Sequence, residues 1–216
     1  MIDIDLIIFD LDGTLIDSKE DIAGAVEYTM QKLGIPPVPR DVMLSYVGFG
    51  MRELIEKTLG PANRRLYAEG LSIFRKYYEE NVAANSGLYP GVAEVLEHFS
   101  DKRKAVVTNR SGRSAGISLK SLGLKKYFET VMNGDDPLCM KPMACPIERA
   151  LGSALFRIEK DKALMVGDMV VDVEAGKSAG IVTCAVTYGI GKRADLVKAG
   201  PDHMIDDITE LVKIVK

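Results

Sequence analysis

Two aspartates end an apolar run near the N-terminus, in the segment LIIFDLDGTLIDS at residues 6–18. On a strand, Asp10 and Asp12 would point to the same side, because side chains alternate between the two faces. Two carboxylates held this close repel each other unless a proton or a cation intervenes. The pair is therefore either the polar turn that ends a strand or part of a functional site.

Other residues that can bind phosphate or a cation follow later apolar runs. Thr108 and Asn109 come directly after the run KAVV. Asp168 follows ALMVG, Asp172 comes four residues later, and Lys141 opens the helical stretch after ETVMN. In doubly wound sheets the ligand crevice lies at the carboxyl ends of the strands. We therefore expect these side chains to meet the aspartate pair at one edge of a sheet.

The elements that position these residues are strands and helices in alternation. Apolar runs of strand length occur at residues 5–9, 104–108, 129–133, 163–167 and 182–186. Helical patterns lie between them at about 112–122, 147–158 and 171–179. Such alternation forms βαβ units around a parallel sheet that is covered on both faces. The predicted fold class is α/β, with a doubly wound, Rossmann-like parallel sheet.

An all-helical region interrupts this alternation directly after the first strand. Helical patterns cover about residues 18–33, 40–59 and 61–81. Ser18 and Asp21 are typical of a capping box at the start of the first of these helices. The segment NSGLYPG at 85–91 then breaks the pattern. We predict an α/β core formed by residues 1–17 and 85–216, with an inserted helical cap formed by residues 18–84.

Composition and charge exclude several classes of protein. Hydrophobic residues make up 47% of the 216 residues, charged residues 27%, and the net charge is −3. The chain therefore lacks the basic excess with which proteins bind nucleic-acid phosphates. No apolar run reaches the length of a membrane span, and no leader-like segment opens the chain. We expect a cytoplasmic protein that acts on a small phosphorylated metabolite and binds neither nucleic acid nor membrane. The sequence leaves a monomer and a homodimer equally open.

The cysteines and histidines give no sign of a separate site. Cys139, Cys145 and Cys184 are odd in number and have no C-x-x-C spacing. We expect the free thiols of a reducing cytosol rather than a disulfide framework. His98 and His203 lie far apart in amphipathic stretches. That separation argues against a catalytic triad built on histidine.

Four segments, taken together and in this order, resemble the haloacid dehalogenase superfamily of phosphatases: FDLDGTLIDS, VTNR, KP and GDMVVDVEAGKSAG. Within that superfamily the chain is similar to the phosphoglycolate phosphatase group over nearly its whole length. The helical insertion resembles that group's cap. The resemblance implies a hydrolase of small phosphomonoesters, with 2-phosphoglycolate as a candidate substrate.

The resemblance also implies roles for the polar residues. Asp10 would attack phosphorus and form an aspartyl-phosphate, and Asp12 would act as general acid and then base. Lys141 and the Thr108 hydroxyl would meet the phosphoryl oxygens, with amides from Asn109 onward donating to the same oxygens. Dehalogenation is disfavoured, because cleavage of a carbon–halogen bond needs no acid at Asp12.

The carboxylates further predict a divalent cation. Several acids that converge without histidine or cysteine favour a hard cation, and we expect Mg²⁺. The resemblance implies Asp10, the backbone carbonyl of Asp12, and Asp168 as ligands. It places Asp172 beside the cation through a water molecule.

Two other functions share part of this pattern. A phosphomutase of the same superfamily would use the same core motifs and differ in its cap. A non-catalytic module that binds phosphate or a nucleotide is the alternative from another class. The G-x-G in GFGMRE at 48–53 follows no strand and lacks the third glycine of the dinucleotide fingerprint.

Two departures from the group pattern and one cap residue complete the expectations. The group usually has a second proline after Lys141-Pro142, where this chain has MACP, and a lysine where this chain has Arg110. We expect neither change to touch the chemistry. Arg52, just after two glycines in the cap, or the free backbone amides beside it at the start of a helix, would bind the carboxylate of a small acid substrate. The alternative is that Arg52 forms a surface pair with Glu56.

Overall fold

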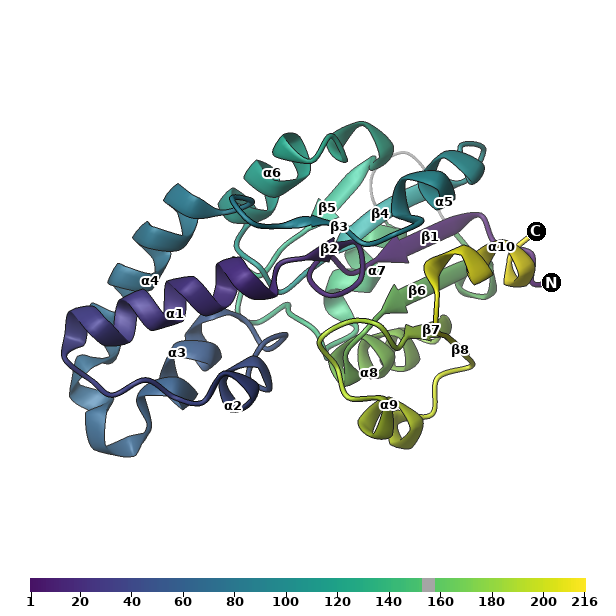
Figure 1. Ribbon diagram of the computed structural model, residues 1–216. Coiled ribbons are helices and arrows are strands. Elements are labelled where there is room, and N and C mark those ends of the chain that lie inside the picture. Colours follow the sequence, from purple (N-terminus) through teal and green to yellow (C-terminus); the bar gives the residue numbers. More distant parts are fainter. Residues whose placement is uncertain (153–157) are drawn as a thin grey trace.

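Six parallel strands form the main sheet of the computed structural model, which describes residues 1–152 and 158–216 (Figure 1). The strand order is β5-β4-β1-β6-β7-β8. The strands are β1 (Leu6–Phe9), β4 (Arg103–Val107), β5 (Thr130–Met132), β6 (Ala163–Gly167), β7 (Val182–Val186) and β8 (His203–Ile205). The five expected strands are present, and the doubly wound fold class is confirmed. The edge strand β8 was not expected, because it has only three residues, two of them partly exposed, and gives no apolar run.

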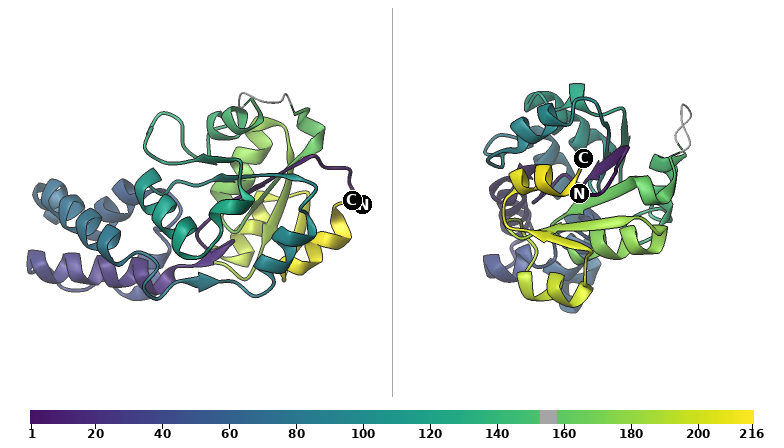
Figure 2. Two further views of the ribbon diagram at one scale, coloured as in Figure 1. Left: turned by 90° about the horizontal axis from the view of Figure 1, so that it is seen from above. Right: turned by 90° about the vertical axis from the view of Figure 1, so that its right-hand side faces the viewer.

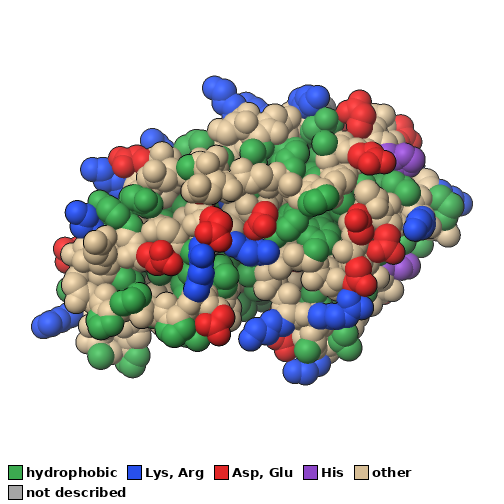
Figure 3. All heavy atoms as spheres, in the orientation of Figure 1, with side chains coloured by type: hydrophobic (Ala, Val, Ile, Leu, Met, Phe, Trp, Pro, Cys, Tyr) green, Lys and Arg blue, Asp and Glu red, His purple; other side chains and the backbone are tan. Residues whose placement is uncertain are grey.

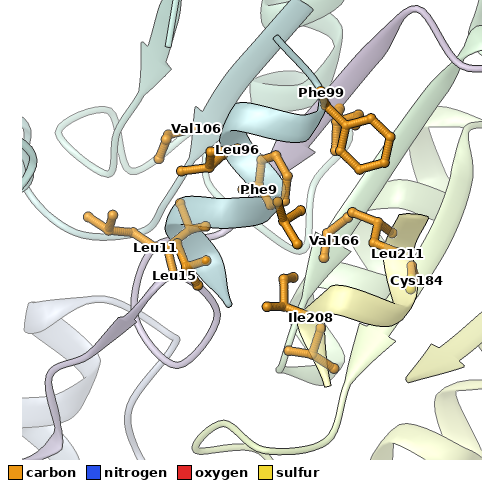
Figure 4. Close-up of a cluster of buried hydrophobic side chains, with 14 of the residues drawn as sticks. Phe9, Leu11, Leu15, Leu96, Phe99, Val106, Val166, Cys184, Ile208 and Leu211 are labelled. Atoms are coloured by element: carbon orange, nitrogen blue, oxygen red, sulfur yellow. The ribbon is translucent and has the colours of Figure 1, made fainter. Parts of the chain in front are cut away.

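Helices cover both faces of the sheet, because β1 sends alternate side chains to opposite sides. Ile7 and Phe9 join one hydrophobic cluster with α5, α6 and α10, part of which is drawn in Figure 4. Leu6 and Ile8 join a second cluster with α7 and α8. Burying one such large side chain contributes about 1.5–3 kcal/mol. The helices are α5 (Val92–His98), α6 (Gly112–Ser121), α7 (Cys145–Leu151), α8 (Val170–Ala179), α9 (Arg193–Ala199) and α10 (Leu211–Ile214).

Helical turns and one predicted helix complete the core. Short 3-10 turns occur at η2 (Lys125–Tyr127), η3 (Lys160–Lys162) and η4 (Ile208–Glu210). The helix predicted over 147–158 corresponds to α7, which begins earlier and ends at Leu151. Ala154 and Leu155 of that prediction lie outside the described residues.

The insertion between β1 and β4 in the sequence is helical, as predicted. Its elements are α1 (Lys19–Leu33), α2 (Arg40–Leu44), α3 (Met51–Leu59), η1 (Pro61–Leu66) and α4 (Tyr67–Asn81). They enclose a hydrophobic cluster of their own that includes Met30, Ile55 and Phe74. Figure 2 shows these helices at the end of the molecule opposite the two chain termini. The molecule is therefore an α/β core with an inserted helical cap.

A loop divides the helix that the sequence predicts over residues 40–59. The α2 helix ends at Leu44 and α3 begins at Met51. Between them Gly48 and Gly50 have φ values of 99° and 89°, a conformation that favours glycine. A side chain at Gly48 would collide with Met169, and one at Gly50 would collide with Met140. The glycines thus let this cap loop lie directly against the core.

The two connections between core and cap lie side by side. Strand β2 (Ile16–Asp17) pairs with β3 (Gly87–Leu88) in an antiparallel ribbon. Asp21 of α1 accepts hydrogen bonds of 2.9 Å from the backbone and side-chain nitrogens of Asn85. The predicted capping box is wrong, because the Ser18 side chain makes no capping bond to α1. Asp21 instead links the connection that enters the cap, before α1, to the connection that returns to the core, before β3.

The prediction that the cysteines are free is wrong for two of them. Cys139 and Cys145 form a disulfide across the segment that carries Lys141. Cys184 on β7 is a buried free thiol. The spacing of six residues matches no familiar motif, so the pairing depends on a loop path that the sequence does not reveal.

The surface carries charges of both signs. In Figure 3 blue and red side chains are interspersed over the visible face, with no large patch of one sign. Among the described residues, no helix combines the length and the apolar character needed to cross a membrane.

Candidate active site

The carboxyl ends of three adjacent strands bring the predicted residues together. β1 lies between β4 and β6, and Asp10 is the first residue after β1. Thr108 is the first residue after β4, and Asp168 the first after β6. Because β1 ends at Phe9, the aspartate pair lies beyond the strand. The expected alternation of Asp10 and Asp12 therefore does not set their directions, although both line one cavity.

Asp10 pairs with Lys141 in the interior. The Lys141 ammonium lies 2.5 Å from Asp10 Oδ1 and 2.6 Å from Asp172 Oδ1, and it donates to the Val107 carbonyl at 2.7 Å. Lys141 is only 4% exposed. Burial would lower the pKa of Lys141, but Asp10 and Asp172 outweigh burial and raise it. Lys141 is therefore a fixed positive charge beside the candidate nucleophile.

Three buried carboxylates form a compact oxygen cluster. Asp10, Asp168 and Asp172 each offer an oxygen that lies within 4.8 Å of the others. Burial, with Asp172 adding to it, raises the pKa of Asp168 to about 7. Burial also raises the pKa of Asp10 well above its usual value, against the opposing charge of Lys141. Hard divalent cations prefer such a donor set, and a bound cation would reverse these shifts.

Asp168 is held in place by groups that the sequence did not single out. The Thr14 hydroxyl donates to Oδ1 at 3.0 Å, and the amides of Ile190 and Gly191 donate to Oδ2 at 2.7 and 3.2 Å. A side chain on Gly191 would lie 1.9 Å from the Asp168 carbonyl oxygen. The G-x-G of YGIGK was the available signal, since glycine permits such a close approach.

Asp12 has two partners, and both correct the expectations. The Ser18 hydroxyl, predicted to cap α1, donates to Asp12 Oδ1. Arg110 Nε donates to Asp12 Oδ2 at 2.9 Å, and Arg110 Nη2 donates to Oδ1. We expected the change to Arg110 to have no contact with the catalytic groups. That expectation is wrong, because Arg110 forms a bidentate pair with Asp12, the candidate general acid. The pair spans 98 positions of sequence, which no local pattern reveals.

Thr108 and Asn109 differ in what they leave available. The Thr108 oxygen accepts from the Arg110 amide at 3.1 Å, which leaves its hydroxyl proton for a ligand. The Asn109 side-chain nitrogen donates to the carbonyls of Gly48 and Lys141, both at 2.8 Å, and its oxygen accepts from the Lys141 amide. Asn109 therefore joins the cap loop to the Lys141 segment. Substrate binding at Asn109 remains a prediction for its backbone amide alone.

Arg52 is not among the residues that line the small cavity with Asp10 and Asp12. It is exposed on α3 and lines an outer cleft of about 1,090 Å³ between cap and core. Among the described residues it pairs with no carboxylate, so the predicted pair with Glu56 is not formed; Lys57 pairs with Glu53 instead. The role of Arg52 in substrate binding stays a prediction.

A smaller cavity of about 60 Å³ lies directly over the candidate site. The core supplies Asp10, Asp12, Thr108, Arg110 and Lys141 to its wall. The cap supplies mainly apolar side chains and one tyrosine: Ile22, Val47, Met51, Leu54, Phe74 and Tyr78. The arrangement can hold a small group against Asp10 and shield it from water.

Known proteins share this fold and this sequence pattern. The chain matches the family model of haloacid dehalogenase-like hydrolases over residues 7–186. It is 37% identical to a phosphoglycolate phosphatase from Aquifex aeolicus (strain VF5), an overlap that covers 97% of this chain and 96% of the relative. It is 34% identical to a phosphoglycolate phosphatase from Vibrio parahaemolyticus, over 99% of this chain and 96% of the relative.

Solved structures agree with these matches. The crystal structure of a predicted phosphoglycolate phosphatase from Haemophilus somnus 129pt superposes with a TM-score of 0.89 at 28% identity, covering 98% of this chain and 97% of that one. A haloacid dehalogenase-like hydrolase from Streptococcus pneumoniae superposes with a TM-score of 0.88 at 27% identity, covering 98% of both chains. The similarity therefore extends over the core and the inserted cap together.

Proposed function

Because this chain belongs to the haloacid dehalogenase-like hydrolase family and is a phosphatase by its relatives, we propose that it hydrolyses small phosphomonoesters with Mg²⁺ through an aspartyl-phosphate on Asp10. The observation that carries the proposal is the buried pair of Asp10 and Lys141 at the wall of a small cavity, 2.5 Å apart. A phosphoryl group placed there would meet a nucleophile and a positive charge together.

The reaction divides into two displacements at phosphorus. First, an Asp10 oxygen attacks phosphorus, and the bond to the leaving oxygen breaks as Asp12 gives that oxygen a proton. Second, a water molecule attacks the same phosphorus and gives its proton to Asp12. Inorganic phosphate then leaves, and Asp10 regains its carboxylate.

Neighbouring side chains hold these groups in position. Ser18 and Arg110 fix the carboxylate of Asp12 from two sides. The Lys141 ammonium and the free hydroxyl proton of Thr108 would meet the phosphoryl oxygens. A unit charge pair at about 4 Å and an effective dielectric of about 20 interacts by roughly 4 kcal/mol before desolvation. Lys141 therefore has the larger electrostatic effect of the two.

The carboxylate cluster fits Mg²⁺, because its donors are oxygens alone. Asp10 and Asp168 would hold the cation with the backbone carbonyl of Asp12, and Asp172 would act through water. When bound, the cation would supply positive charge against the phosphoryl oxygens. Thr14 and the amides of Ile190 and Gly191 keep Asp168 turned toward that position.

The helical cap would act as a lid and limit the substrate. Closing a cap over the phosphoryl group excludes bulk water from the intermediate. The contact between Asn109 and Gly48 holds the cap loop against the Lys141 segment. The small cavity and the relatives named phosphoglycolate phosphatase support 2-phosphoglycolate as the substrate. For an enzyme that acts on a free metabolite of this kind, we further propose a place in the cytoplasm.

Replacing the nucleophile tests the proposal. Asp10→Asn should lower the rate of phosphate release from 2-phosphoglycolate with Mg²⁺ by about a thousandfold or more, since it removes the attacking oxygen. Asp5→Asn makes the same chemical change at an exposed position just before β1 and should leave the rate near that of the parent. Retention of a tenth of the activity by Asp10→Asn would rule out the covalent mechanism.

A further inference from the structure

Arg110 and Tyr78 meet at the boundary between core and cap. Arg110 comes from the loop after β4, and Tyr78 from α4 of the cap. The guanidinium carbon lies 5.3 Å from the centre of the Tyr78 ring. Both residues are buried, Arg110 at 8% exposure and Tyr78 at 4%, and both line the small cavity over Asp10.

Arg110 is the second of two cations in the wall of that cavity, among the residues that the structure describes. The first, Lys141, donates hydrogen bonds to Asp10 and to the Val107 carbonyl and forms an ion pair with Asp172. It therefore belongs to the phosphoryl end of the cavity. Arg110 pairs instead with Asp12, the residue that would protonate the leaving oxygen.

Both Arg110 and Tyr78 have hydrogen-bonding capacity to spare. A guanidinium has five N–H donors. Arg110 uses two on Asp12 and one on the Ser118 hydroxyl, at 2.5 Å, which leaves two. The Tyr78 hydroxyl is buried and has no hydrogen-bond partner among the described residues. Buried polar groups are nearly always paired, so an orphaned hydroxyl in a cavity wall points to a ligand.

We propose that Arg110 and Tyr78 bind the carboxylate of the leaving group, and so select phosphate esters of short 2-hydroxy acids. This inference rests on the proposed phosphatase function. Asp12 must contact the leaving oxygen, and Arg110 grips Asp12 directly. The atoms one or two bonds beyond that oxygen therefore fall beside the guanidinium. A carboxylate there accepts from the spare Arg110 donors and from the Tyr78 hydroxyl.

Apart from Tyr78, the cap side chains that the structure describes in this wall are apolar. Val47, Leu54 and Phe74 are apolar and buried, and they close the cavity beside Tyr78. Desolvating a charge against these side chains alone would be costly. Arg52, the cation expected from the sequence, lines the outer cleft and is not part of this wall. The carboxylate site assigned here thus draws its charge from the core.

The test compares two esters that differ only at the proposed contact: 2-phosphoglycolate and 2-hydroxyethyl phosphate, in which the carboxylate is a hydroxymethyl group. Tyr78→Phe keeps the ring and removes the orphaned hydroxyl. It should lower kcat/KM for 2-phosphoglycolate by tenfold or more, chiefly by raising KM, and change the value for 2-hydroxyethyl phosphate by less than twofold. Arg110→Lys should lower both values, because Asp12 loses its bidentate partner, and lower that of the acid more.

Two further variants locate the carboxylate. Arg64→Met removes an exposed arginine of the outer cleft and should leave the preference for the acid unchanged. Equal losses for both esters in Tyr78→Phe would overturn the proposal and leave Tyr78 with a packing role. The proposal would also be overturned if Arg52→Ala lost the preference for 2-phosphoglycolate while Tyr78→Phe kept it. That result would place the carboxylate in the outer cleft.

Direct binding separates this inference from the proposed function. Calorimetry with Asp10→Asn protein should show tenfold weaker binding of 2-phosphoglycolate when Tyr78→Phe is added. Unchanged binding would contradict the carboxylate site even if wild-type turnover is normal. If the wild-type protein released phosphate from neither ester, the proposed function would fail, and the same binding comparison would still decide between the two outcomes for Tyr78.

Discussion

Asp168 shows how burial and neighbouring charge act on a single residue of this site. Its pKa rises from an ordinary value of 3.8 to about 7, first because it is buried and then because Asp172 lies beside it. Without a cation, the folded protein therefore holds this proton more tightly than the unfolded chain does. Stability that depends on the proton is present below about pH 4 and is lost as the pH rises toward 7.

We predict that the free energy of unfolding in EDTA falls between pH 5 and pH 7.5 by a few kcal/mol. Added Mg²⁺ should remove most of this decline, because a cation stabilises the charged carboxylates. Asp168→Asn should flatten the pH dependence in EDTA and weaken the response to Mg²⁺. Urea unfolding at the two pH values measures both effects. Equal stability of the wild type at both pH values in EDTA would count against the assigned environment of Asp168.

At the scale of elements, the Lys141 segment is constrained at both ends. The disulfide between Cys139 and Cys145 links the two ends of the segment. Asn109, in the loop after β4, forms two hydrogen bonds with the backbone of Lys141. A short closed loop of this kind stabilises a protein mainly by restricting the unfolded chain. The constraint also limits where the Lys141 ammonium can lie relative to Asp10.

We predict that reduction of this disulfide costs about 2 kcal/mol of stability and lowers Tm by roughly 4–8 °C. Thermal unfolding with and without dithiothreitol measures the loss. Cys139→Ser should melt at the lower temperature under both conditions, because it cannot form the bond. A wild-type Tm that does not respond to the reductant would show that the bond contributes nothing to the fold.

How much of these elements the sequence could predict depends on their length and burial. β1, β4 and β6 are fully or almost fully buried, so each appears in the sequence as an apolar run. These runs predicted the strands and also the polar residues that follow them. β2 and β3 have two residues each and are partly exposed, and their pairing depends on how the chain returns from the cap. No periodicity records such a pairing.

The site was predictable to the same extent. Asp10, Asp168, Asp172 and Lys141 cluster because parallel strands end at one edge, which is a property of the fold. The bonds to Asp12 were not predictable, since Ser18 had an equally good local role as a helix cap and Arg110 lies 98 positions away. Side chains with several possible partners are settled only by the packed structure.

At the scale of the whole molecule, the core supplies the polar residues of the candidate site and the cap supplies mainly apolar residues that cover it. Figure 2 shows the helical cap at one end and the sheet at the other. The candidate active site lies after the carboxyl ends of the strands, where cap and core residues line one cavity. Two adjacent connections, paired as β2 and β3, join the two parts. We expect such a join to let the cap move as one unit, with the hydrogen bond between Asp21 and Asn85 keeping the two connections together.

We predict that the cap excludes large substrates. A phosphoserine on a folded protein cannot enter a cavity of about 60 Å³, so its kcat/KM should be at least about a hundredfold below that of a two-carbon ester. Phosphate release from a folded phosphoprotein, set beside 2-phosphoglycolate under the same conditions, measures the ratio. Comparable efficiency on both would contradict a closing cap.

The proposed mechanism requires that the phosphoryl group of the substrate is bonded covalently to Asp10 before water releases it. Enzyme mixed with substrate and Mg²⁺ can be quenched in acid during turnover and treated with borohydride, which reduces an acyl phosphate on aspartate to homoserine. Mass spectrometry of the N-terminal peptide should then find homoserine at position 10 and unmodified aspartate at position 12. Rapid phosphate release with no reduction at Asp10, or with reduction at a different carboxylate, would contradict the account.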